Sequence, residues 1–532
     1  MQPMELIDEV KGNYGTVVDV GVNSQGNRYY LFDRAFDSIL LNGYPLYVLP
    51  KDTITSSPYY FGRPYLVGVE GAQPIFAIRP GGETLNLTDS SIFVITHITE
   101  DTLITTDTFF INAAAGPGTN LLLIEYNFQG IRIDSKHWQS PYNCFVQGRT
   151  MVETNSAIFL SGEYGGNAGG LLLDGHFLDI GSGNGNGFVG KMNNDKTMEW
   201  LRGVSGDGYQ VNNMIAVNKK NQVLNTGASA SSFVYFCEDS LENMATIDWG
   251  TDFLYFVQFD SSGQCINKKT IDYVYGNTIP NSITTLTDNS FVVSGEFNPT
   301  YIGFDSFYLF NPTNDITGFL VKMSDDLITQ GVFQLQGSPG SKHIASMVSD
   351  ENNNVWITGY TSADTLQVGN TILVANSPDD PMGFLARLDA NFNVISAQKL
   401  EQGRGQKLII GQDSNLYLLA RLAAGSHKFF KVMIPITADE SIPFSDKENN
   451  VVNVYPNPVS HKRRLINYEL IQPTNESILL IHVYSINGDL IMSEKTNQIR
   501  GSLNLEKIND NLIFVEFITD KYKRITKKVL IN

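Results

Sequence analysis

The 532-residue chain has no run of about 18 consecutive apolar residues, and long apolar segments with a helical period of about 3.6 are scarce. The first absence argues against a transmembrane helix, and the second argues against a helical fold. Short runs of Val, Ile, Phe and Tyr recur instead, separated by Asn, Gly, Ser and Asp. Such runs are typical of strands joined by turns, so we predict an all-β fold.

Positive charge is also scarce. The chain holds 37 Lys and Arg against 55 Asp and Glu, which gives a formal net charge of −18. The residues from Val451 onward carry eleven basic and eight acidic side chains, a net of +3, so the preceding 450 residues carry −21. A negative field repels phosphate backbones, and we therefore expect no nucleic-acid partner. The change of sign indicates a separate C-terminal domain.

Cysteine is rare, and the chain lacks the common catalytic motifs. Cys144, Cys237 and Cys265 cannot all pair within one chain, and they have no CxxC or metal-ligand spacing. A Cys237–Cys265 bridge is one possibility, and three buried free thiols are the arrangement that we expect. The seven histidines show no HxxxH or HExxH spacing, and no GxSxG or GxxxxGK[ST] motif occurs. The sequence assigns no catalytic, cofactor-binding or metal-ligating residue.

Acidic turns are the one feature that suggests a bound cation. The turn at residues 350–354 reads Asp-Glu-Asn-Asn-Asn and could supply oxygen ligands to Ca²⁺. It follows no EF-hand or nonapeptide pattern. We interpret it as a solvated hairpin turn and expect no cofactor.

A strand-like element recurs seven times along the chain, at spacings of 61 to 68 residues. Each copy follows a polar patch and, before that patch, another apolar run, which together predict a hairpin with a tight Asn/Asp/Gly turn. The copies are NRYYLF (27), SIFVIT (91), AIFLSG (157), QVLNTG (222), SFVVSG (290), NVWITG (354) and NLYLLA (415).

A second element follows the hairpins with the same period. Its clearest copies begin at residues 187, 254, 318 and 383, with a weaker copy at 121, and most lead through a polar turn to a further strand. Four strands per unit, with an insert between the second and third, predict a β-propeller. An open β-solenoid is the alternative architecture, and its usual period is shorter.

The ends of the repeat region favour a closed ring. The last unit stops after its third strand at residues 427–436, whereas the chain begins with a strand and a Gly-bearing link. We therefore expect residues 5–11 to complete the last blade, which would protect the sheet edges. The prediction is seven blades over residues 1–437, and six or eight would require one copy to be spurious or missed.

The middle units share a layout with a known repeat family. NVWITG, QVGNTIL and GFLARLD follow one another between residues 354 and 389. This order resembles the bacterial SBBP, or β-propeller repeat, family, and the resemblance covers roughly Tyr14 to Thr437. It concerns the fold, because propellers host unrelated functions.

The repeat ends before residues 438–450, which form a polar linker. Short alternating strands separated by Asn-Gly and Asp turns follow, and they predict a small Ig-like β-sandwich over residues 451–532. Pro456 and Pro458 hold the residues before them extended, which fixes the entry into this domain.

The C-terminal block carries several motifs in a defined order. YPNP at residues 455–458 is followed by an I-x-V-Y segment with Gly488, an L-x-L segment and a basic terminal strand. The block resembles the type A C-terminal sorting domain of the bacterial type IX secretion system. It departs from the family at Asn511 and Phe514, where Gly and Tyr are usual, and an ordinary Ig-like module is the alternative. The sorting residues by this resemblance are Tyr455, Pro456, Asn457, Pro458, Gly488, Lys527 and Lys528.

The sorting resemblance implies a route and a destination. Such proteins cross the periplasm and are exported through the outer membrane of Bacteroidota by the type IX secretion machinery. They are then released or attached to the cell surface. The route requires an N-terminal Sec signal, and residues 1–12 lack the basic and apolar regions of one, so we expect the signal peptide to be absent from this chain.

Two aromatic loops are the candidate ligand contacts. The first spans residues 56–65 and the second spans residues 304–310. Exposed aromatic side chains suit contact with sugar or protein surfaces. The alternative is that these aromatic side chains pack the inserts against neighbouring blades. We expect a protein- or glycan-binding protein, and the alternative is a propeller hydrolase or lyase acting on polysaccharide. A ring of Asp, Glu, His and Arg at the centre would favour the enzyme, and a Ser, Thr and apolar lining would favour binding. The candidate contacts are Tyr59, Tyr60, Phe61, Tyr65, Phe307 and Tyr308.

Overall fold

The structure is a computed structural model, and all regular elements in the residues that it describes are strands. The all-β prediction is therefore confirmed. Contacts divide the chain into two compact units, Met1–Met433 and Ile434–Asn532. No helix long and apolar enough to cross a membrane occurs in the described part of the chain. The described residues are 4–12, 17–35, 38–47, 63–78, 84–98, 102–104, 109–111, 120–139, 144–154, 156–166, 169–180, 185–243, 252–273, 276–376, 381–422, 426–433, 452–455, 464–470, 477–484, 490–506, 508, 512–519 and 524–531.

The strands of the first unit pair into seven four-stranded antiparallel sets, which we call blades and number along the chain. Blade 1 consists of β2 (Val17–Val22), β3 (Arg28–Ala35), β6 (Arg63–Glu70) and β7 (Gln73–Ile78). Blade 2 consists of β8 (Thr84–Leu87), β9 (Ser91–Ile98), β12 (Asn120–Asn127) and β13 (Arg132–Trp138). Blade 3 consists of β14 (Cys144–Glu153), β15 (Ile158–Gly166), β18 (Asn186–Met192) and β19 (Met198–Gly206).

Blades 4 to 6 repeat the same order. Blade 4 consists of β20 (Gln210–Val217), β21 (Val223–Ser229), β24 (Phe253–Phe259) and β25 (Cys265–Thr270). Blade 5 consists of β27 (Thr278–Thr285), β28 (Phe291–Phe297), β31 (Thr317–Met323) and β32 (Thr329–Gln334). Blade 6 consists of β34 (Lys342–Ser349), β35 (Val355–Thr361), β38 (Met382–Leu388) and β39 (Val394–Lys399).

The seventh blade is built from both ends of the unit. It consists of β40 (Arg404–Ile410), β41 (Leu416–Arg421), β42 (His427–Val432) and β1 (Met4–Gly12). The N-terminal strand pairs antiparallel with β42, from Met4 opposite Val432 to Val10 opposite His427. The strand predicted at residues 5–11 is thus β1, and it supplies the fourth strand of this blade.

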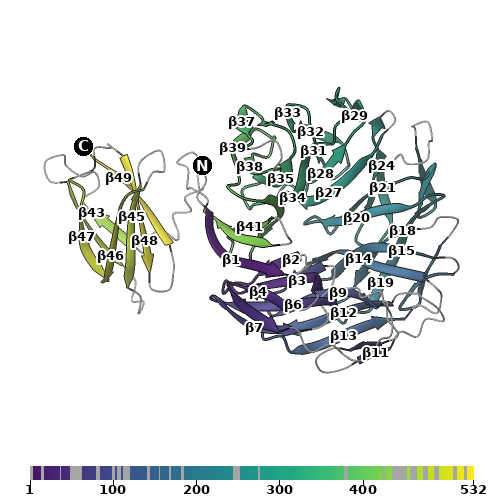
Figure 1. Cartoon of the computed structure of the whole chain (residues 1–532), viewed down its shortest axis with the longest axis horizontal. Coiled ribbons are helices and arrows are strands. Elements are labelled where there is room, and N and C mark those ends of the chain that lie inside the picture. The colour runs from purple at the N-terminus through teal and green to yellow at the C-terminus, as the bar shows by residue number, and fades with distance from the viewer. Residues whose placement is uncertain are drawn as a thin grey trace. The chain divides into compact units, whose positions relative to one another are not determined.

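The first strands of the blades form a closed cycle. Strands β2, β8, β14, β20, β27, β34 and β40 contact one another in this order, and β40 contacts β2. Figure 1 shows first strands such as β14, β20 and β27 around the middle of the ring, with β7, β13 and β29 at its perimeter. Each blade buries its faces against its neighbours, so large apolar clusters span adjacent blades.

A buried ion pair joins the closing strand to blade 1. Arg28 of β3 donates from Nε and Nη2 to the two carboxylate oxygens of Asp8, each at 2.9 Å. The Tyr30 hydroxyl donates to Asp8 at 2.5 Å, and Asn42 donates to it at 2.8 Å. Burial alone lowers the pKa of Arg28, but Asp8 outweighs it and the pKa is raised. Burial and the Asp8 charge raise the pKa of Tyr30 well above its usual value.

The polar patches of the repeat form five-residue hairpin turns. In the turn from Asn218 to Gln222, the Asn218 Oδ1 atom accepts the backbone N–H groups of Lys220 and Gln222, each at 3.0 Å. Asn221, one position before the end of the turn, has a left-handed φ of 57°. The same pattern recurs from Asp350 to Asn354. Asn, Asp and Gly suit these positions because they bond their own backbone and tolerate positive φ.

In the part of the chain that the structure describes, six blades carry an insert hairpin between the second and third strands. In two inserts the first strand pairs with the outer strand of the preceding blade. Strand β4 pairs with β1, and β22 pairs with β19. Two more pair with short strands, β26 (Asp272–Tyr273) and β33 (Gln336–Gly337). The hairpins are β4 (Ser38–Leu41) with β5 (Tyr44–Tyr47), β10 (Thr102–Ile104) with β11 (Phe109–Ile111), β16 (Gly170–Leu173) with β17 (His176–Asp179), β22 (Phe233–Phe236) with β23 (Asp239–Glu242), β29 (Tyr301–Phe304) with β30 (Phe307–Phe310), and β36 (Thr365–Val368) with β37 (Thr371–Val374).

The second unit holds two sheets around one core. One sheet has the order β43 (Val452–Tyr455), β44 (Leu465–Leu470) and β47 (Arg500–Asn504); the other has the order β46 (Leu490–Gln498), β45 (Ile478–Tyr484), β48 (Leu512–Thr519) and β49 (Arg524–Leu530). Tyr468 and Phe517 join the sheets with ring centroids 5.3 Å apart. The predicted linker, 438–450, lies outside the described residues, and the Ig-like class stays a prediction.

The Asp8–Arg28 pair yields a stability prediction. Asp8→Asn leaves the Arg28 charge buried without a carboxylate, so we expect the first unit to lose about 3–5 kcal/mol of unfolding free energy. Urea unfolding followed by tryptophan fluorescence measures this unit alone, because all four tryptophans precede Met433. Glu5→Gln is the control on the same strand, because Glu5 is exposed and its change should stay within about 0.5 kcal/mol. Equal stability of the two variants would contradict the role of the ion pair.

Candidate functional site

The first strands of blades 1 and 3 to 7 carry a β-bulge, whereas β8 of blade 2 pairs regularly with β9. The pairing with the second strand skips one or two residues there, and a bulge of this kind redirects a side chain. The skipped residues are Val18, Arg149, Asn212 with Asn213, Asn281, Ala345 and Gln406.

The recurring glycine of the second strand is explained by these bulges. A Cβ atom on Gly359 would lie 1.9 Å from the carbonyl oxygen of His343, and one on Gly162 would lie 2.0 Å from that of Gln147. Gly295 faces the carbonyl of Ile279 in the same way, at 2.6 Å. The SG and TG pairs of the repeat therefore allow the bulged first strand to pass close to the second strand.

Two residues that follow these glycines, Glu296 and Tyr360, gather with Asn281, His343 and Arg404 of the first strands into an inner polar cluster. They come from blades 5, 6 and 7. His343 Nδ1 lies 3.0 Å from Glu296 Oε2. The His343 ring stacks on Tyr360 with centroids 4.4 Å apart, and the Arg404 guanidinium lies 4.9 Å from the centre of the Tyr360 ring. Asn281 Nδ2 donates to Glu296 Oε1 at 2.7 Å.

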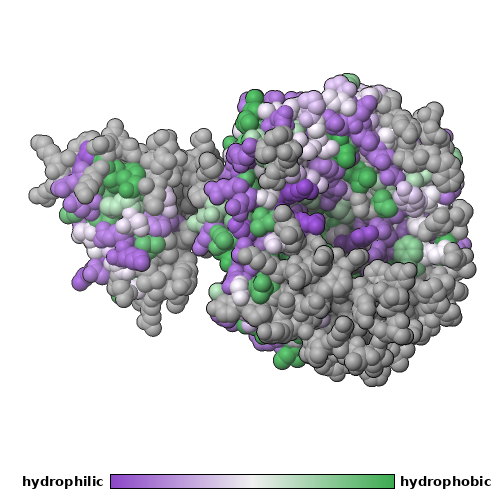
Figure 2. Space-filling view, in the orientation of Figure 1, coloured by the Kyte–Doolittle hydropathy of each residue, from purple (hydrophilic) through white to green (hydrophobic). Residues whose placement is uncertain are grey.

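The inner polar cluster is open to solvent in part. The His343 and Glu296 side chains are 16% and 21% exposed. Two further ion pairs involve first strands, Arg149 with Glu163 at 3.0 Å and Lys407 with Asp19 at 2.9 Å. Figure 2 shows hydrophilic residues around the middle of the ring on the face that it draws. The first strands thus hold paired charges and one histidine. The histidine can transfer a proton, and the basic side chains can neutralise an acidic group of a ligand.

Sequence reasoning missed the inner polar cluster. One signal was available, because Glu163, Glu296 and Tyr360 each directly follow the repeated glycine. Aligning the seven copies would have marked this position as chemically variable. Nothing in the sequence places His343 or Arg404 beside it, because that contact depends on how adjacent blades pack.

A groove beside the insert of blade 5 is the second candidate feature. Its volume is about 390 Å³, and we call it the insert groove. Tyr308 and Phe310 of β30 are 46% and 65% exposed, while Leu309 between them is buried. Gln334 Nε2 donates to the Phe310 carbonyl at 2.8 Å. The lining is formed by Tyr308, Leu309, Phe310, Val332, Phe333, Gln334, Gln336 and Gly369.

The predicted aromatic contacts fall in three different places. Tyr308 lines the insert groove, and Phe307 is half-buried at the start of β30. Tyr65 is only 4% exposed and belongs to the core beside Tyr30 and Phe32, so it is not a surface contact. Both faces of β6 are covered from Tyr65 to Val69, so this ring is buried with its neighbours. The remaining candidates, Tyr59, Tyr60 and Phe61, lie outside the described residues.

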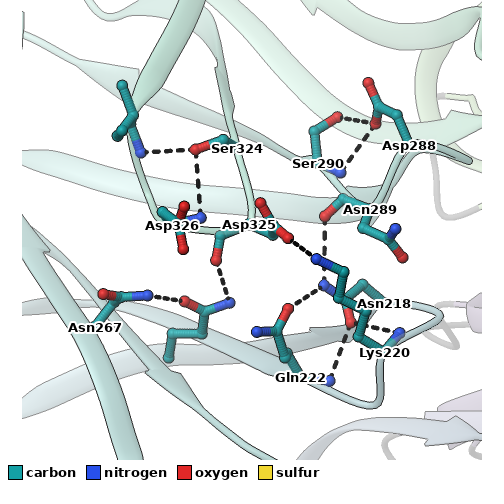
Figure 3. Close-up of polar contacts among 12 residues, drawn as sticks. Asn218, Lys220, Gln222, Asn267, Asp288, Asn289, Ser290, Ser324, Asp325 and Asp326 are labelled. Atoms are coloured by element: carbon teal, nitrogen blue, oxygen red, sulfur yellow. Dashed lines mark hydrogen bonds and ion pairs between the residues drawn. The ribbon is translucent and has the colours of Figure 1, made fainter.

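Polar turns link blades 4 and 5 away from the inserts. Figure 3 shows Lys220 reaching across to Asp325, which forms an ion pair between the turn after β20 and the turn after β31. The Gln258 side chain donates to the Asp325 carbonyl at 2.9 Å, and Asp288 accepts hydrogen bonds from Ser290. These carboxylates already bind protein donors, so we assign this network a structural role.

The carboxylate of the turn considered as a Ca²⁺ site also accepts hydrogen bonds from protein donors. Asp350 accepts the side-chain amide of Asn354 on both oxygens at 3.0 Å and the Trp356 indole N–H at 3.0 Å. Within the described ranges, no group of three or more His, Cys, Asp or Glu side chains is arranged to hold a metal ion.

The sorting residues lie in the second unit. Tyr455 ends β43 and is 45% exposed. Lys527 and Lys528 lie in β49, which is at one edge of the four-stranded sheet. Burial lowers the pKa of Lys527. Pro456, Asn457, Pro458 and Gly488 lie outside the described residues.

Comparisons with known proteins find only distant structural similarity. No family model matches the sequence, and no curated protein matches it. Similar solved structures include the Dos1 propeller (7% identity, TM-score 0.42, 80% of this chain and 95% of that one) and the WD40 β-propeller domain of Doa1 (6%, 0.37, 81% and 97%). A PL25 ulvan lyase bound to -[GlcA(1-4)Rha3S]- is also similar (10%, 0.41, 81% and 96%).

The class of the first unit follows from its own strands. Four-stranded antiparallel blades, with first strands in a closed cycle, define a β-propeller. At these low identities the comparisons say nothing about activity.

Proposed function

We propose that the propeller binds a carbohydrate along the insert groove. The observation that carries this proposal is the lining of the groove, where Tyr308 and Phe310 are exposed beside Gln334 and Gln336. Sugar rings present C–H faces that pack on aromatic rings, and hydroxyls that need both donors and acceptors. A carboxamide supplies both. None of the described residues that line the groove is charged, so a neutral segment of the ligand fits it best.

Substitutions in the groove test carbohydrate binding. On a glycan array with the full chain, we expect Tyr308→Ala with Phe310→Ser to weaken binding about tenfold or more, because each ring contributes roughly 0.5–1.5 kcal/mol beyond its area. Ile328→Ser is the control, because Ile328 is 62% exposed in the turn between β31 and β32, outside the groove lining. Binding that survives the double variant, or a wild-type chain that binds proteins and no glycan, would overturn the proposal.

A lyase acting on acidic polysaccharide is the second candidate, favoured by the inner polar cluster. Elimination from a uronic acid requires a base for the carbon-bound proton and a cation for the adjacent carboxylate. With Nδ1–H directed to Glu296, the His343 Nε2 atom is the basic nitrogen, and Arg404 supplies the positive charge. Hydrolysis needs two carboxylates across the scissile bond, and this cluster contains only Glu296.

The lyase candidate has its own test. If it is correct, the wild-type full chain should release unsaturated products from a uronic-acid polysaccharide, measured by the ultraviolet absorbance of the new C=C bond. His343→Gln should lower that rate about 10²–10⁴-fold, because a positioned base contributes this much. His176→Gln is the control, because His176 lies on an insert hairpin and contacts the Met198 carbonyl. A wild-type chain without products removes the lyase candidate and leaves the binding proposal intact.

We also propose that the second unit directs type IX export, which would place the protein outside the cell or on the outer-membrane surface. The support is its motif order together with its own core of Val452, Ile481 and Val529 among others. An independent core allows a domain to fold as a separate signal. Its partner would be the type IX secretion machinery.

Deletion of residues 451–532 in the native host tests this export. We expect the truncated chain to accumulate in the periplasm, measured by fractionation and surface proteolysis. Replacing residues 438–450 by a Gly/Ser linker of equal length is the control, and it should leave export unchanged. Normal surface display of the truncated chain would refute the sorting assignment.

A further inference from the structure

Two of the three cysteines lie side by side at the perimeter of blade 4. Cys237 occupies the tight turn between β22 and β23, and Cys265 is the first residue of β25. The two thiols lie close enough for each to shift the pKa of the other. Both are reduced in this structure; Cys237 is exposed and Cys265 is partly buried. The expectation of buried thiols is therefore wrong for Cys237, because a two-residue turn projects into solvent.

Other contacts hold the turn against β25 independently of the thiols. Lys268 of β25 lies 2.5 Å from the Asp239 carboxylate and donates to the Ser240 carbonyl at 3.0 Å. Its ammonium group also lies 5.8 Å from the centre of the Phe236 ring. The turn and the strand are thus fixed together on both sides of Cys237.

The corresponding turns of other inserts show the role of the turn position that Cys237 occupies. In blade 3, Asp174 accepts the backbone N–H of Met198, the first residue of the fourth strand, at 3.0 Å. In blade 5, Asp305 accepts the N–H of Thr329 at 2.8 Å, again at the start of the fourth strand. Blade 4 places Cys237 and Cys265 at these two positions. The pair therefore stands where a side chain anchors the insert to its own blade.

Cys237 is also an unusual residue for this backbone. Its φ is 52°, in the left-handed region, where the equivalent turns have Asn42, Asp174, Asp305 and Gly369. Asn, Asp and Gly adopt this conformation readily, whereas other side chains are strained there. A strained cysteine next to a second cysteine indicates a role for the sulfur itself.

We propose that Cys237 and Cys265 form a disulfide that staples the insert of blade 4 to β25. Because β22 also pairs with β19 of blade 3, the disulfide would tie the perimeters of two blades together. It would close the segment between residues 237 and 265, which restricts the unfolded chain. This inference concerns the thiols alone and does not depend on the ligand or export proposals.

The chemistry is thiol–disulfide exchange with a small disulfide oxidant, RSSR. The Cys237 thiolate attacks one sulfur of RSSR, a mixed disulfide forms, and RS⁻ leaves. Cys265 then loses its proton and attacks the Cys237 sulfur, which releases the second RS⁻. The protein gives up two protons and two electrons, and RSSR is reduced to two thiols.

The electrostatics of the pair assign the two roles. A hydrogen bond from Cys265 lowers the pKa of Cys237 to about 6, against the opposing effect of burial, so Cys237 is the exposed attacking thiolate. The hydrogen bond and charge of the Cys237 thiolate, together with burial, raise the pKa of Cys265. Once Cys237 is in a mixed disulfide its negative charge is gone, and Cys265 can ionise more easily.

The test is the thiol content of the purified full chain before and after incubation with oxidised glutathione. We expect the free thiols to fall from three to one, with an intact-mass loss of about two hydrogens and a peptide that links Cys237 to Cys265. Cys144→Ser is the control and should form the same link. Three persisting thiols, a link that includes Cys144, or a stable glutathione adduct on wild-type Cys237 would each overturn the proposal.

A second measurement separates the staple from the mere presence of thiols. The oxidised wild-type chain and the oxidised Cys144→Ser chain should unfold at a higher temperature than their reduced forms. Cys237→Ser changes an exposed turn residue and should fold normally, but oxidation should not raise its unfolding temperature. An equal rise in Cys237→Ser would refute the staple.

Discussion

The buried carboxylate of Asp8 and the strand pairing of β1 connect the beginning of the chain to the rest of the ring. Strand β1 completes a blade whose other strands lie about 400 residues later, and backbone pairing with β42 joins it to that blade. The bidentate Asp8–Arg28 pair ties the same strand to blade 1. Two buried opposite charges must stay together, because separating them leaves each desolvated and unpaired. The pair adds to the direct contact between β40 and β2 that closes the cycle of first strands.

The closed cycle in turn gives the centre of the ring its chemistry. In blades 3, 5 and 6 the bulged first strand needs glycine in the second strand, since a Cβ on Gly359, for example, would collide with the His343 carbonyl. The residues that follow those glycines then meet side chains of the next blade, as Glu296 meets His343. Such contacts exist only when consecutive blades are held at a constant spacing, which an open chain of blades would not guarantee. At the perimeter, by contrast, turn residues hold an insert to its own blade, as Asp305 does in blade 5. The same insert exposes Tyr308 and Phe310.

Much of this architecture was predictable from local patterns. The strands, the hairpin turns and the inserts follow from alternation, Asn/Asp/Gly placement and a period of about 65 residues. The aromatic contacts were predicted less well. Tyr65 and Tyr308 look alike in sequence, yet Tyr65 is buried and Tyr308 is 46% exposed. Both are aromatic residues in short strands, and only the neighbouring strands decide which face is covered.

The sequence by itself determined the all-β character, the repeat, the strand that completes the seventh blade and the change in pattern and charge near residue 450. These are properties of backbone conformation and composition, which neighbouring residues encode. Tertiary structure alone decided that Glu296 and Arg404, 108 residues apart, share one cluster, and that Cys237 meets Cys265. The physical reason is that a side chain's partner depends on how adjacent blades pack. Blade packing leaves no periodic mark in the sequence, whereas the repeated glycine marks only where the chain bulges.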